Sequence, residues 1–594
     1  MFPGKLRVLR LASFTAASFV LAPQSQAEYP AVQAPGLMPS GTLAVVTVNG
    51  FNQCAAGVMA FADAIGAPTD EFDAASRAIE MINMEGVLDP ANSGLDLDRE
   101  FILFLSGEGI AGAVAPLADG EPVVHSLNAE AVSTSDMNGE TIYLLGAPGD
   151  ADAPPQIHAA ALMRGESLIT STDEGALRAM ISPHEPPALS GAIAQPDVGE
   201  IAVAIDLDSI ITTYRPMIDQ MLGMAQMMMA QNQQAPDAAF GMAMAMVRGA
   251  VQVASEIDTV EVSFRADQEA VVIDTQAALR AGSALLASLP RHVHNDTALS
   301  GRLPGDPFVV LSSSFDAERG ARALADFSRW YVNAIAPAGS EPALADRIAQ
   351  MCQDLYATLG DQIAYGIYPG EGIMPGVAIA MRAPDPAAAL AQMRAMMSDE
   401  SLTSHMGVLY GLPASAEVTI VDLGSQEVGG VPAHHIQLTG LGDMVQAMAP
   451  ASGEEAAVMQ SVAEQLGVID YWMASDAENL YMTTEPQPVL LARMLGGASA
   501  PLTVPSLASG VTGGADLIMK ISVGGALRWA SNAMPLPAPP EITTLAEALS
   551  QSETGIWAGA TIIENGVRFG LAVPAADVAR IVEMAGTEPT PPGN

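Results

Sequence analysis

Two histidines and an aspartate alternate in a short polar segment near the middle of the chain, and these residue types bind transition metals. The segment reads His292-Val293-His294-Asn295-Asp296. Imidazole nitrogens and carboxylate oxygens are common zinc ligands, but a zinc site needs several of them held in a fixed geometry. Thr297 supplies no further strong ligand, and no long apolar strand leads into the segment. We therefore interpret it as a solvated linker and predict neither a metal site nor a cofactor.

A second stretch, rich in oxygen ligands, can be aligned with a calcium-binding loop. Asp89, Gly94 and Glu100 fall at the first, sixth and twelfth positions of such a loop. However, Ala91 and Leu97 stand where further ligands are expected, and the flanking segments do not indicate a helix–loop–helix. We interpret the match as coincidental.

The remaining residue patterns predict no catalytic centre. His434 and His435 are neighbours on an expected strand, so they face opposite sides and do not share a metal. The chain lacks the Gly-x-Ser-x-Gly, His-Glu-x-x-His and Walker motifs. Lys520 has Leu517 three residues before it, which excludes Ser-x-x-Lys chemistry. An enzyme assembled from residues distant in sequence stays open, since active sites need not leave local motifs.

Methionines recur at helical spacing in one segment, from about residue 210 to residue 255. They are Met217, Met221, Met224, Met228, Met242 and Met246. The spacing predicts two helices joined by a turn at 231–237. Methionine is flexible and polarizable, so such a face suits an apolar ligand or a protein partner, although it is also typical of a packed core. Thioethers also bind Cu(I), but no neighbouring His or Cys supports copper. We select these six methionines as candidate ligand-binding residues.

The N-terminus has the pattern of a secretory signal peptide. Lys5, Arg7 and Arg10 precede an apolar stretch that is too short to cross a bilayer, and Ala27 ends a small-residue cleavage site. We expect residues 1–27 to be removed and the protein to be exported, to the periplasm or outside the cell. No later stretch is apolar enough over a sufficient length to predict a transmembrane segment.

The charge balance excludes a class of partners. The chain has 24 Lys and Arg against 67 Asp and Glu, a formal net charge of −43. Such a charge repels nucleic acids and anionic lipid headgroups, so we predict no nucleic-acid partner. Charged residues are nevertheless only 15% of the chain, against about 25% in ordinary domains. Apolar residues are therefore plentiful enough for two cores.

Cys54 and Cys352 are the two cysteines of the chain. An exported pair could form a disulfide that joins the two halves. The alternative is two separate thiols, since a free cysteine packs as a small apolar residue. Both alternatives stay open at the level of sequence.

Similar segments recur in the same order in the two halves of the chain. The clearest pair is Gly107–Ile110 and Gly370–Ile373, which both read GEGI and follow apolar runs, as hairpin turns do. The other pairs are a strand leading into a helix (43–65 and 308–331), three strands with a helix (139–180 and 431–495), a second strand–helix unit (from 201 and from 515) and a closing hairpin (260–275 and 556–573). Hairpins mixed with helices predict an antiparallel sheet.

We therefore predict an α+β protein made of two tandem copies of a mostly antiparallel sheet-plus-helices unit. The methionine helices are an inserted helical hairpin in the first copy. The expected domains are 28–290 and 306–586, with a linker at 291–305 and a disordered tail at 587–594.

Each copy opens with a proline, a hydrophobic strand and a short turn into a helix, at Pro39 and at Pro304. This opening resembles a loose set of uncharacterised exported bacterial repeat-containing α+β proteins. The resemblance extends over most of the mature chain and implies no activity and no functional residue.

These observations favour an exported, non-enzymatic binding protein whose ligand is an apolar molecule or a protein partner. The alternatives are a periplasmic hydrolase without a local sequence motif and a structural protein of the cell envelope.

Overall fold

The computed structural model divides the chain into two compact units. The first comprises Met1–Thr213 with Ile257–Ala278, and the second comprises Tyr214–Glu256 with Leu279–Asn594. The structure describes residues 37–39, 41–67, 73–106, 111–147, 156–182, 189, 200–231, 238–289, 292–293, 295, 297–335, 343–370, 374–398, 419–448, 454–497, 500–533, 540–550 and 555–586. The expected signal peptide and tail lie outside these residues.

Spatial contacts group the inserted helical hairpin differently from the sequence pattern. They place Tyr214–Glu256 with the second unit, whereas the sequence pattern makes the hairpin an insert in the first copy. The division by spatial contacts depends on which residues lie close together, whereas the division by repeats depends on chain order. The predicted domain boundaries therefore stay a prediction.

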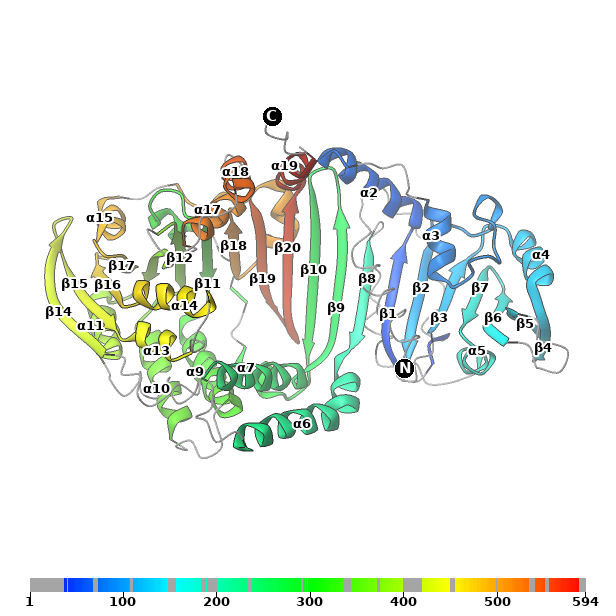
Figure 1. Ribbon diagram of the computed structural model, residues 1–594, viewed down its shortest axis with the longest axis horizontal. Coiled ribbons are helices and arrows are strands. Elements are labelled where there is room, and N and C mark those ends of the chain that lie inside the picture. Colours follow the sequence, from blue (N-terminus) through cyan, green and yellow to red (C-terminus); the bar gives the residue numbers. More distant parts are fainter. Residues whose placement is uncertain are drawn as a thin grey trace. The chain divides into compact units, whose positions relative to one another are not determined.

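The first unit is built on an antiparallel sheet (Figure 1). Its described strands are β1 (Thr42–Asn49), β2 (Glu100–Ser106), β3 (Ala111–Pro116), β4 (Ala131–Met137), β5 (Glu140–Ala147), β6 (Gln156–Arg164), β7 (Ser167–Ser171), β8 (Ile201–Asp206), β9 (Ile257–Ala266) and β10 (Ala270–Leu279). They pair in the order β10–β9–β8–β1–β2–β3–β7–β6–β5–β4, and the pairings from β9 to β4 are antiparallel.

The second unit has a sheet with the same strand order. Its described strands are β11 (Val309–Ser314), β12 (Gln362–Tyr368), β13 (Gly376–Arg382), β14 (Thr419–Val428), β15 (Val431–Thr439), β16 (Val468–Ser475), β17 (Asn479–Thr484), β18 (Leu517–Ile521), β19 (Ile556–Ile563) and β20 (Gly566–Pro574). The order is β20–β19–β18–β11–β12–β13–β17–β16–β15–β14, antiparallel throughout these pairings. The predicted α+β class with an antiparallel sheet is confirmed.

Helices accompany both sheets. The first unit contains α2 (Phe51–Ile65), α3 (Ala74–Met81), α4 (Gly120–Glu130), α5 (Glu174–Ile181) and the 3₁₀ helix η2 (Pro90–Asn92). α6 (Leu207–Gln231) begins among residues of the first unit and ends among residues of the second. The second unit contains α7 (Ala238–Ser255), α8 (Ala284–Ser288), α9 (Ala317–Ile335), α10 (Leu344–Tyr356), α11 (Pro386–Met397), α13 (Leu441–Met448), α14 (Glu454–Gln465), α15 (Val489–Gly496), α16 (Ser509–Thr512), α17 (Val523–Ala533), α18 (Pro540–Ser550), α19 (Ala575–Gly586), η4 (Ala298–Arg302) and η5 (Ser506–Ala508). Among the described helices, none combines the length and the apolar composition that crossing a membrane requires.

The predicted strand-to-helix openings are present in both units. β1 leads into α2 through Gly50, whose φ of 83° favours glycine. β11 leads into α9, and the Asp316 carboxylate accepts a hydrogen bond from the Arg319 amide at 3.0 Å, as an N-terminal cap does. Residues 107–110 and 371–373 of the two GEGI segments lie outside the described residues, and the strands on either side of each segment pair as hairpins.

Alternate residues of the central strands face two separate cores in the first unit. Phe101 and Leu103 of β2 belong to the core that contains α2, α3 and α4, while Ile102 and Phe104 belong to the core that contains α5. This follows from the two-residue repeat of a strand. The first core includes an edge-to-face contact between Phe51 and Phe101, with ring centroids 4.8 Å apart.

The second unit repeats this arrangement. Trp472 of β16 packs in the core that contains α15, and Met473 packs in the core that contains α11. α5 and α15 therefore hold equivalent places on their sheets, and the groove described below lies beside α15.

The strands at one end of each sheet are interrupted. Among the described pairings, β4 pairs with β5 alone and β14 with β15 alone. The register of β4 shifts between Ala131 and Ser133, and that of β14 shifts between Asp422 and Gly424. Both irregularities are bulges in a strand that is paired along one side.

Candidate functional site

The predicted methionine helices are α6 and α7, and several of their methionine side chains are exposed. Met217, Met221 and Met224 are 52%, 58% and 46% exposed. Met246 of α7 is exposed as well. Met228 and Met242 lie in the two helices, but their side chains, like the turn 232–237, lie outside the described part of the chain.

Three of the exposed methionines of α6 form one stripe. Residues three and four apart on a helix share a face, so Met217, Met221 and Met224 line up with one another. Tyr214, 43% exposed, extends the stripe by one turn toward the N-terminus. We call these four residues the α6 stripe. Tyr214 was missed by sequence reasoning, although its spacing of three from Met217 was the available signal.

This exposure excludes a packed-core role for Met217, Met221 and Met224, one of the two interpretations that the sequence left open. A side chain in a packed core is almost fully removed from water, whereas these are about half exposed. On the same helix Ile211, Ile218 and Leu222 are more buried. The α6 stripe is therefore an exposed apolar surface, next to a less exposed side of the helix.

The segment that resembles a metal cluster is held in place by hydrogen bonds, and the burial of Asn295 shows that the expectation of a solvated linker is wrong there. His292 Nδ1 lies 2.9 Å from an Asp516 carboxylate oxygen, and the Val293 amide donates to the same carboxylate. The buried Asn295 side-chain amide donates to the Ser312 carbonyl at 2.6 Å. His294 and Asp296 lie outside the described residues. Within the described part of the chain, no group of three His, Cys, Asp or Glu side chains is placed to hold a metal.

The two adjacent histidines have separate surroundings, as predicted. His435 is buried, stacks on Trp472 with ring centroids 3.9 Å apart, and places Nε2 2.7 Å from an Asp470 oxygen. Burial, with the nearby Arg394 charge, lowers the pKa of His434. Neither arrangement brings a nucleophile to the imidazole among the described contacts.

The calcium-loop alignment corresponds to ordinary secondary structure. Asp89 caps η2 by accepting a hydrogen bond from the Ala91 amide at 3.1 Å. Glu100 is the first residue of β2, where burial raises the pKa of its carboxyl group. Asp89 and Glu100 therefore lie at a 3₁₀-helix cap and in a strand, in place of a helix–loop–helix, which agrees with the coincidental interpretation.

Both cysteines are free thiols. Of the two alternatives, a disulfide and two separate thiols, the structure therefore has the separate thiols. Burial raises the pKa of the Cys54 thiol to about 12. Cys352 is half-buried and lies 3.6 Å from the Ser328 hydroxyl. The two cysteines provide no reactive pair.

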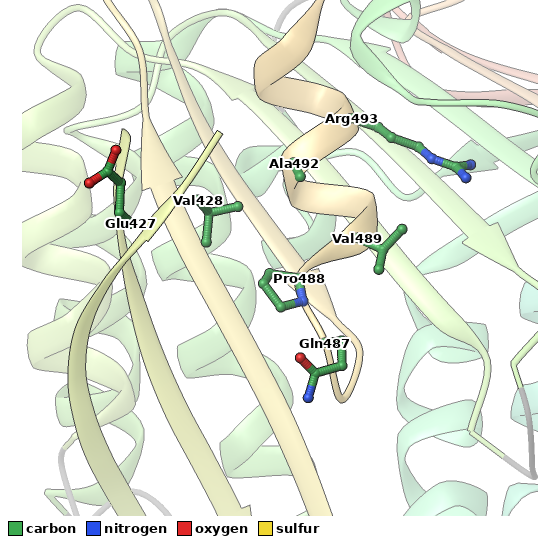
Figure 2. Close-up of a pocket in the computed structure, with 7 residues that line it drawn as sticks. All are labelled: Glu427, Val428, Gln487, Pro488, Val489, Ala492 and Arg493. Carbon is green, nitrogen blue, oxygen red and sulfur yellow. The ribbon is translucent and has the colours of Figure 1, made fainter. Parts of the chain in front are cut away.

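A surface groove of about 460 Å³ lies between α15 and the turn that joins β14 to β15. Its apolar lining consists of Val428, Pro488, Val489 and Ala492. Figure 2 shows Glu427 on one side of the groove and Arg493, directed away from it, on the other. Pockets for small ligands have volumes of roughly 300–1,000 Å³, so this groove can hold a side chain or a small molecule. No motif in the sequence identified it.

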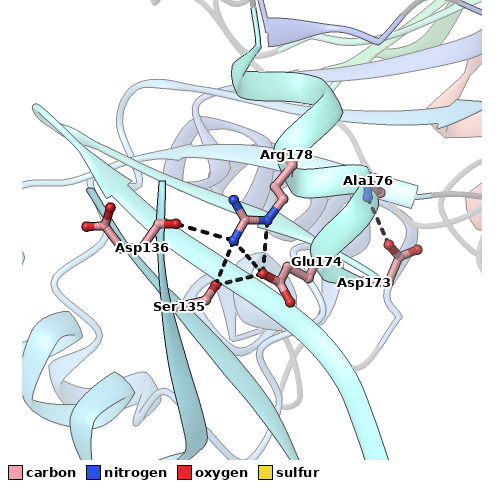
Figure 3. A network of polar contacts seen from close by, with 6 residues as sticks. All are labelled: Ser135, Asp136, Asp173, Glu174, Ala176 and Arg178. Carbon is pink, nitrogen blue, oxygen red and sulfur yellow. Dashed lines mark hydrogen bonds and ion pairs between the residues drawn. The ribbon is translucent and has the colours of Figure 1, made fainter. Parts of the chain in front are cut away.

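A polar network lies between the corresponding strand and helix of the first unit (Figure 3). Arg178 Nη2 donates to Glu174 Oε1 at 2.7 Å, to the Ser135 hydroxyl at 3.1 Å and to the Asp136 carbonyl at 3.4 Å. The Ser135 hydroxyl donates to the same Glu174 oxygen at 2.7 Å. The hydrogen bonds from Ser135 and Arg178 lower the pKa of Glu174.

Comparison with known proteins assigns no family. No family model matches the chain, and no curated protein matches it by sequence. Solved structures of crystal forms I, III and IV of TP0453 align with it at 9% identity and a TM-score of 0.22. The form I alignment covers 43% of this chain and 81% of that chain. A TM-score of 0.22 supports no argument about fold or function.

Proposed function

We propose that this protein is an exported binding protein without catalytic activity, and that it docks a protein partner on the α6 stripe. The observation that carries the proposal is the exposure of Tyr214, Met217, Met221 and Met224 along one helix face. The signal-peptide pattern of the first 27 residues supports export. The common strand order of the two units supports descent from one duplicated unit.

The shape and chemistry of the stripe favour a macromolecule over a small ligand. Small apolar ligands are enclosed in concave sites, whereas these side chains stand about half exposed on a convex helix surface. Methionine adapts to the partner that it packs against, and tyrosine is enriched at the energetic centres of interfaces. Such contiguous apolar exposure marks interaction surfaces in soluble proteins.

The test is a triple variant, Met217→Gln with Met221→Gln and Met224→Gln. The mature protein is isolated gently from its own host and examined by native mass spectrometry, with organic extraction of a parallel sample. We expect a bound polypeptide with the unaltered protein and its loss from the triple variant. Met59→Gln replaces an exposed methionine of α2 and should keep the partner.

Two results would overturn the proposal. Release of a small apolar molecule, with no bound polypeptide, would replace the protein partner with a ligand-carrier role. Unfolding of the triple variant, followed by circular dichroism, would show that the methionines stabilise the fold, because exposed Met→Gln changes should alter stability by less than about 0.5 kcal/mol.

The hydrolase and the envelope structural protein stay as alternative hypotheses. Within the described residues, no group of three His, Cys, Asp or Glu side chains is placed to hold a metal ion, so nothing there favours a metal-dependent hydrolase.

A further inference from the structure

Each unit contains a hairpin with the same turn, β4–β5 in the first and β14–β15 in the second, and a helix lies beside it, α5 or α15. The β4–β5 hairpin turns through Asn138 and Gly139, with φ of 57° and 86°. The β14–β15 hairpin turns through Gly429 and Gly430, with φ of 60° and 83°. Paired positive φ values define one turn type, so the strand ends can be superposed residue by residue. Glu427 then corresponds to Asp136.

The helices beside these turns also share a register. Leu177 and Met180 are the fully buried pair of α5, and Leu491 and Met494 are the fully buried pair of α15. Each pair is spaced by three residues and enters the equivalent core. Matching the pairs sets the alignment of the two helices.

Helix capping agrees with this register. Asp173 accepts a hydrogen bond from the Ala176 amide at 2.8 Å, and Glu485 accepts one from the Leu490 amide at 2.8 Å. Ala176 and Leu490 are each the residue before the first buried leucine of their helix. The same amide is therefore capped in both units.

The register shows that the groove is the vacated counterpart of the Figure 3 network. Glu174 corresponds to Pro488 and Arg178 corresponds to Ala492. Both replacements line the groove. In the first unit the Arg178 side chain fills this space and donates a hydrogen bond to the Asp136 carbonyl. In the second unit Ala492 has no side-chain atoms that could do so.

We propose that the groove beside α15 binds an arginine side chain of a partner polypeptide. Its alkyl stem lies on Pro488 and Ala492, in the place of the Arg178 stem. Its guanidinium group meets the Glu427 carbonyl, the counterpart of the Asp136 carbonyl that Arg178 contacts. The Glu427 carboxylate, which Figure 2 shows at one side of the groove, adds a negative charge at its rim.

Charge complementarity favours this occupant. A guanidinium group is less strongly hydrated than an ammonium group and suits a half-apolar groove. The net charge of −43 attracts cationic partners over long distances. Arg493 is the cation at the groove, and Figure 2 shows its side chain directed away from the Glu427 side. This site is separate from the α6 stripe and does not depend on it.

The probe is a blocked peptide, acetyl-Gly-Gly-Arg-Gly-Gly-amide, titrated into the mature full-length protein by calorimetry. Its control is the same peptide with citrulline, which keeps the shape and removes the charge. We expect one arginine peptide to bind per chain, with the citrulline peptide at least about tenfold weaker because the charge-assisted hydrogen bonds are lost.

A charge-neutral variant separates the groove from general attraction to an acidic protein. Pro488→Glu with Ala492→Arg rebuilds the first unit's pair and leaves the net charge unchanged. We expect the affinity to fall by about tenfold or more. Peptide binding that persists in this variant, or its absence from the unaltered protein, would overturn the proposal.

A second variant keeps the proposal testable if the first does not fold. Arg178→Ala empties the corresponding place in the first unit, so the stoichiometry should rise from one peptide to two. Arg77→Ala removes one positive charge from α3 and serves as the matched control, with the stoichiometry staying at one. An unchanged stoichiometry in Arg178→Ala would show that this space does not select arginine.

Discussion

Glu174 is the residue on which the polar network of the first unit converges. Its Oε1 atom accepts hydrogen bonds from the Ser135 hydroxyl and from Arg178. These donors stabilise the ionised carboxylate, which is why the pKa of Glu174 is lowered. Both partners of the ion pair are about one-third exposed, so solvent reduces the strength of the attraction.

The lowered pKa predicts a pH-dependent contribution to stability. A carboxyl group whose pKa falls on folding stabilises the fold above its unfolded pKa, about 4.3 for glutamate, and loses that contribution as the pH falls through the folded value. We therefore expect Glu174→Gln to melt at a lower temperature than the unaltered protein at pH 7. The difference should shrink as the pH falls below about 4.

Calorimetric melting at several pH values measures this difference. Glu130→Gln, at the exposed end of α4, is the matched control and should change the melting temperature little at any pH. A Glu174→Gln deficit that is as large at pH 3 as at pH 7 would contradict the electrostatic explanation.

At the scale of elements, α15 depends on a cap from outside the helix. Pro488 immediately precedes the helix and has no side-chain group that can accept a hydrogen bond. The Glu485 side chain acts as the N-terminal cap instead, because it accepts hydrogen bonds from the Leu490 and Leu491 amides, at 2.8 and 3.1 Å. These amides would otherwise lack a partner at the helix start.

We expect Glu485→Ala to lower the free energy of unfolding by about 1 kcal/mol, the usual effect of removing an N-terminal cap. Urea unfolding monitored by circular dichroism measures the change. Glu478→Ala, at an exposed turn before β17, is the control and should stay within about 0.5 kcal/mol of the unaltered protein. Equal effects of the two changes would show that the cap has no specific role.

The sequence predicted the elements that have a periodic apolar pattern. The strands that open the two units, the methionine helices and the closing hairpins all have this periodic signal. β4 and β14 were missed because hardly any of their side chains are buried, so the sequences AVSTSDM and TIVDLGSQEV lack the regular apolar alternation of a half-buried strand.

The candidate sites were predictable to different extents. Helical spacing located the methionines of α6, but the same spacing is typical of a buried helix, so their exposure required the structure. The groove had no signal at all. Pro488 and Ala492 belong to no functional sequence pattern. Their correspondence to Glu174 and Arg178 follows only from the structural alignment of α5 with α15.

At the scale of the whole molecule, the charge decides which partners can approach. With a formal net charge of −43, the chain repels a DNA duplex over several ångströms to tens of ångströms, depending on salt. We expect no change in the fluorescence anisotropy of a labelled duplex when the protein is added, even at low ionic strength. An increase that added salt abolishes would contradict this prediction and indicate a cationic surface.

The bulges in β4 and β14 have a consequence for the protein at high concentration. A strand paired along one side offers free amides and carbonyls to any similar strand, which is how sheets join into fibrils. The register shifts beside Ser133 and Gly424 break the regular ladder that such joining needs. We therefore expect β4 and β14 to be poor templates for pairing with a strand of another molecule.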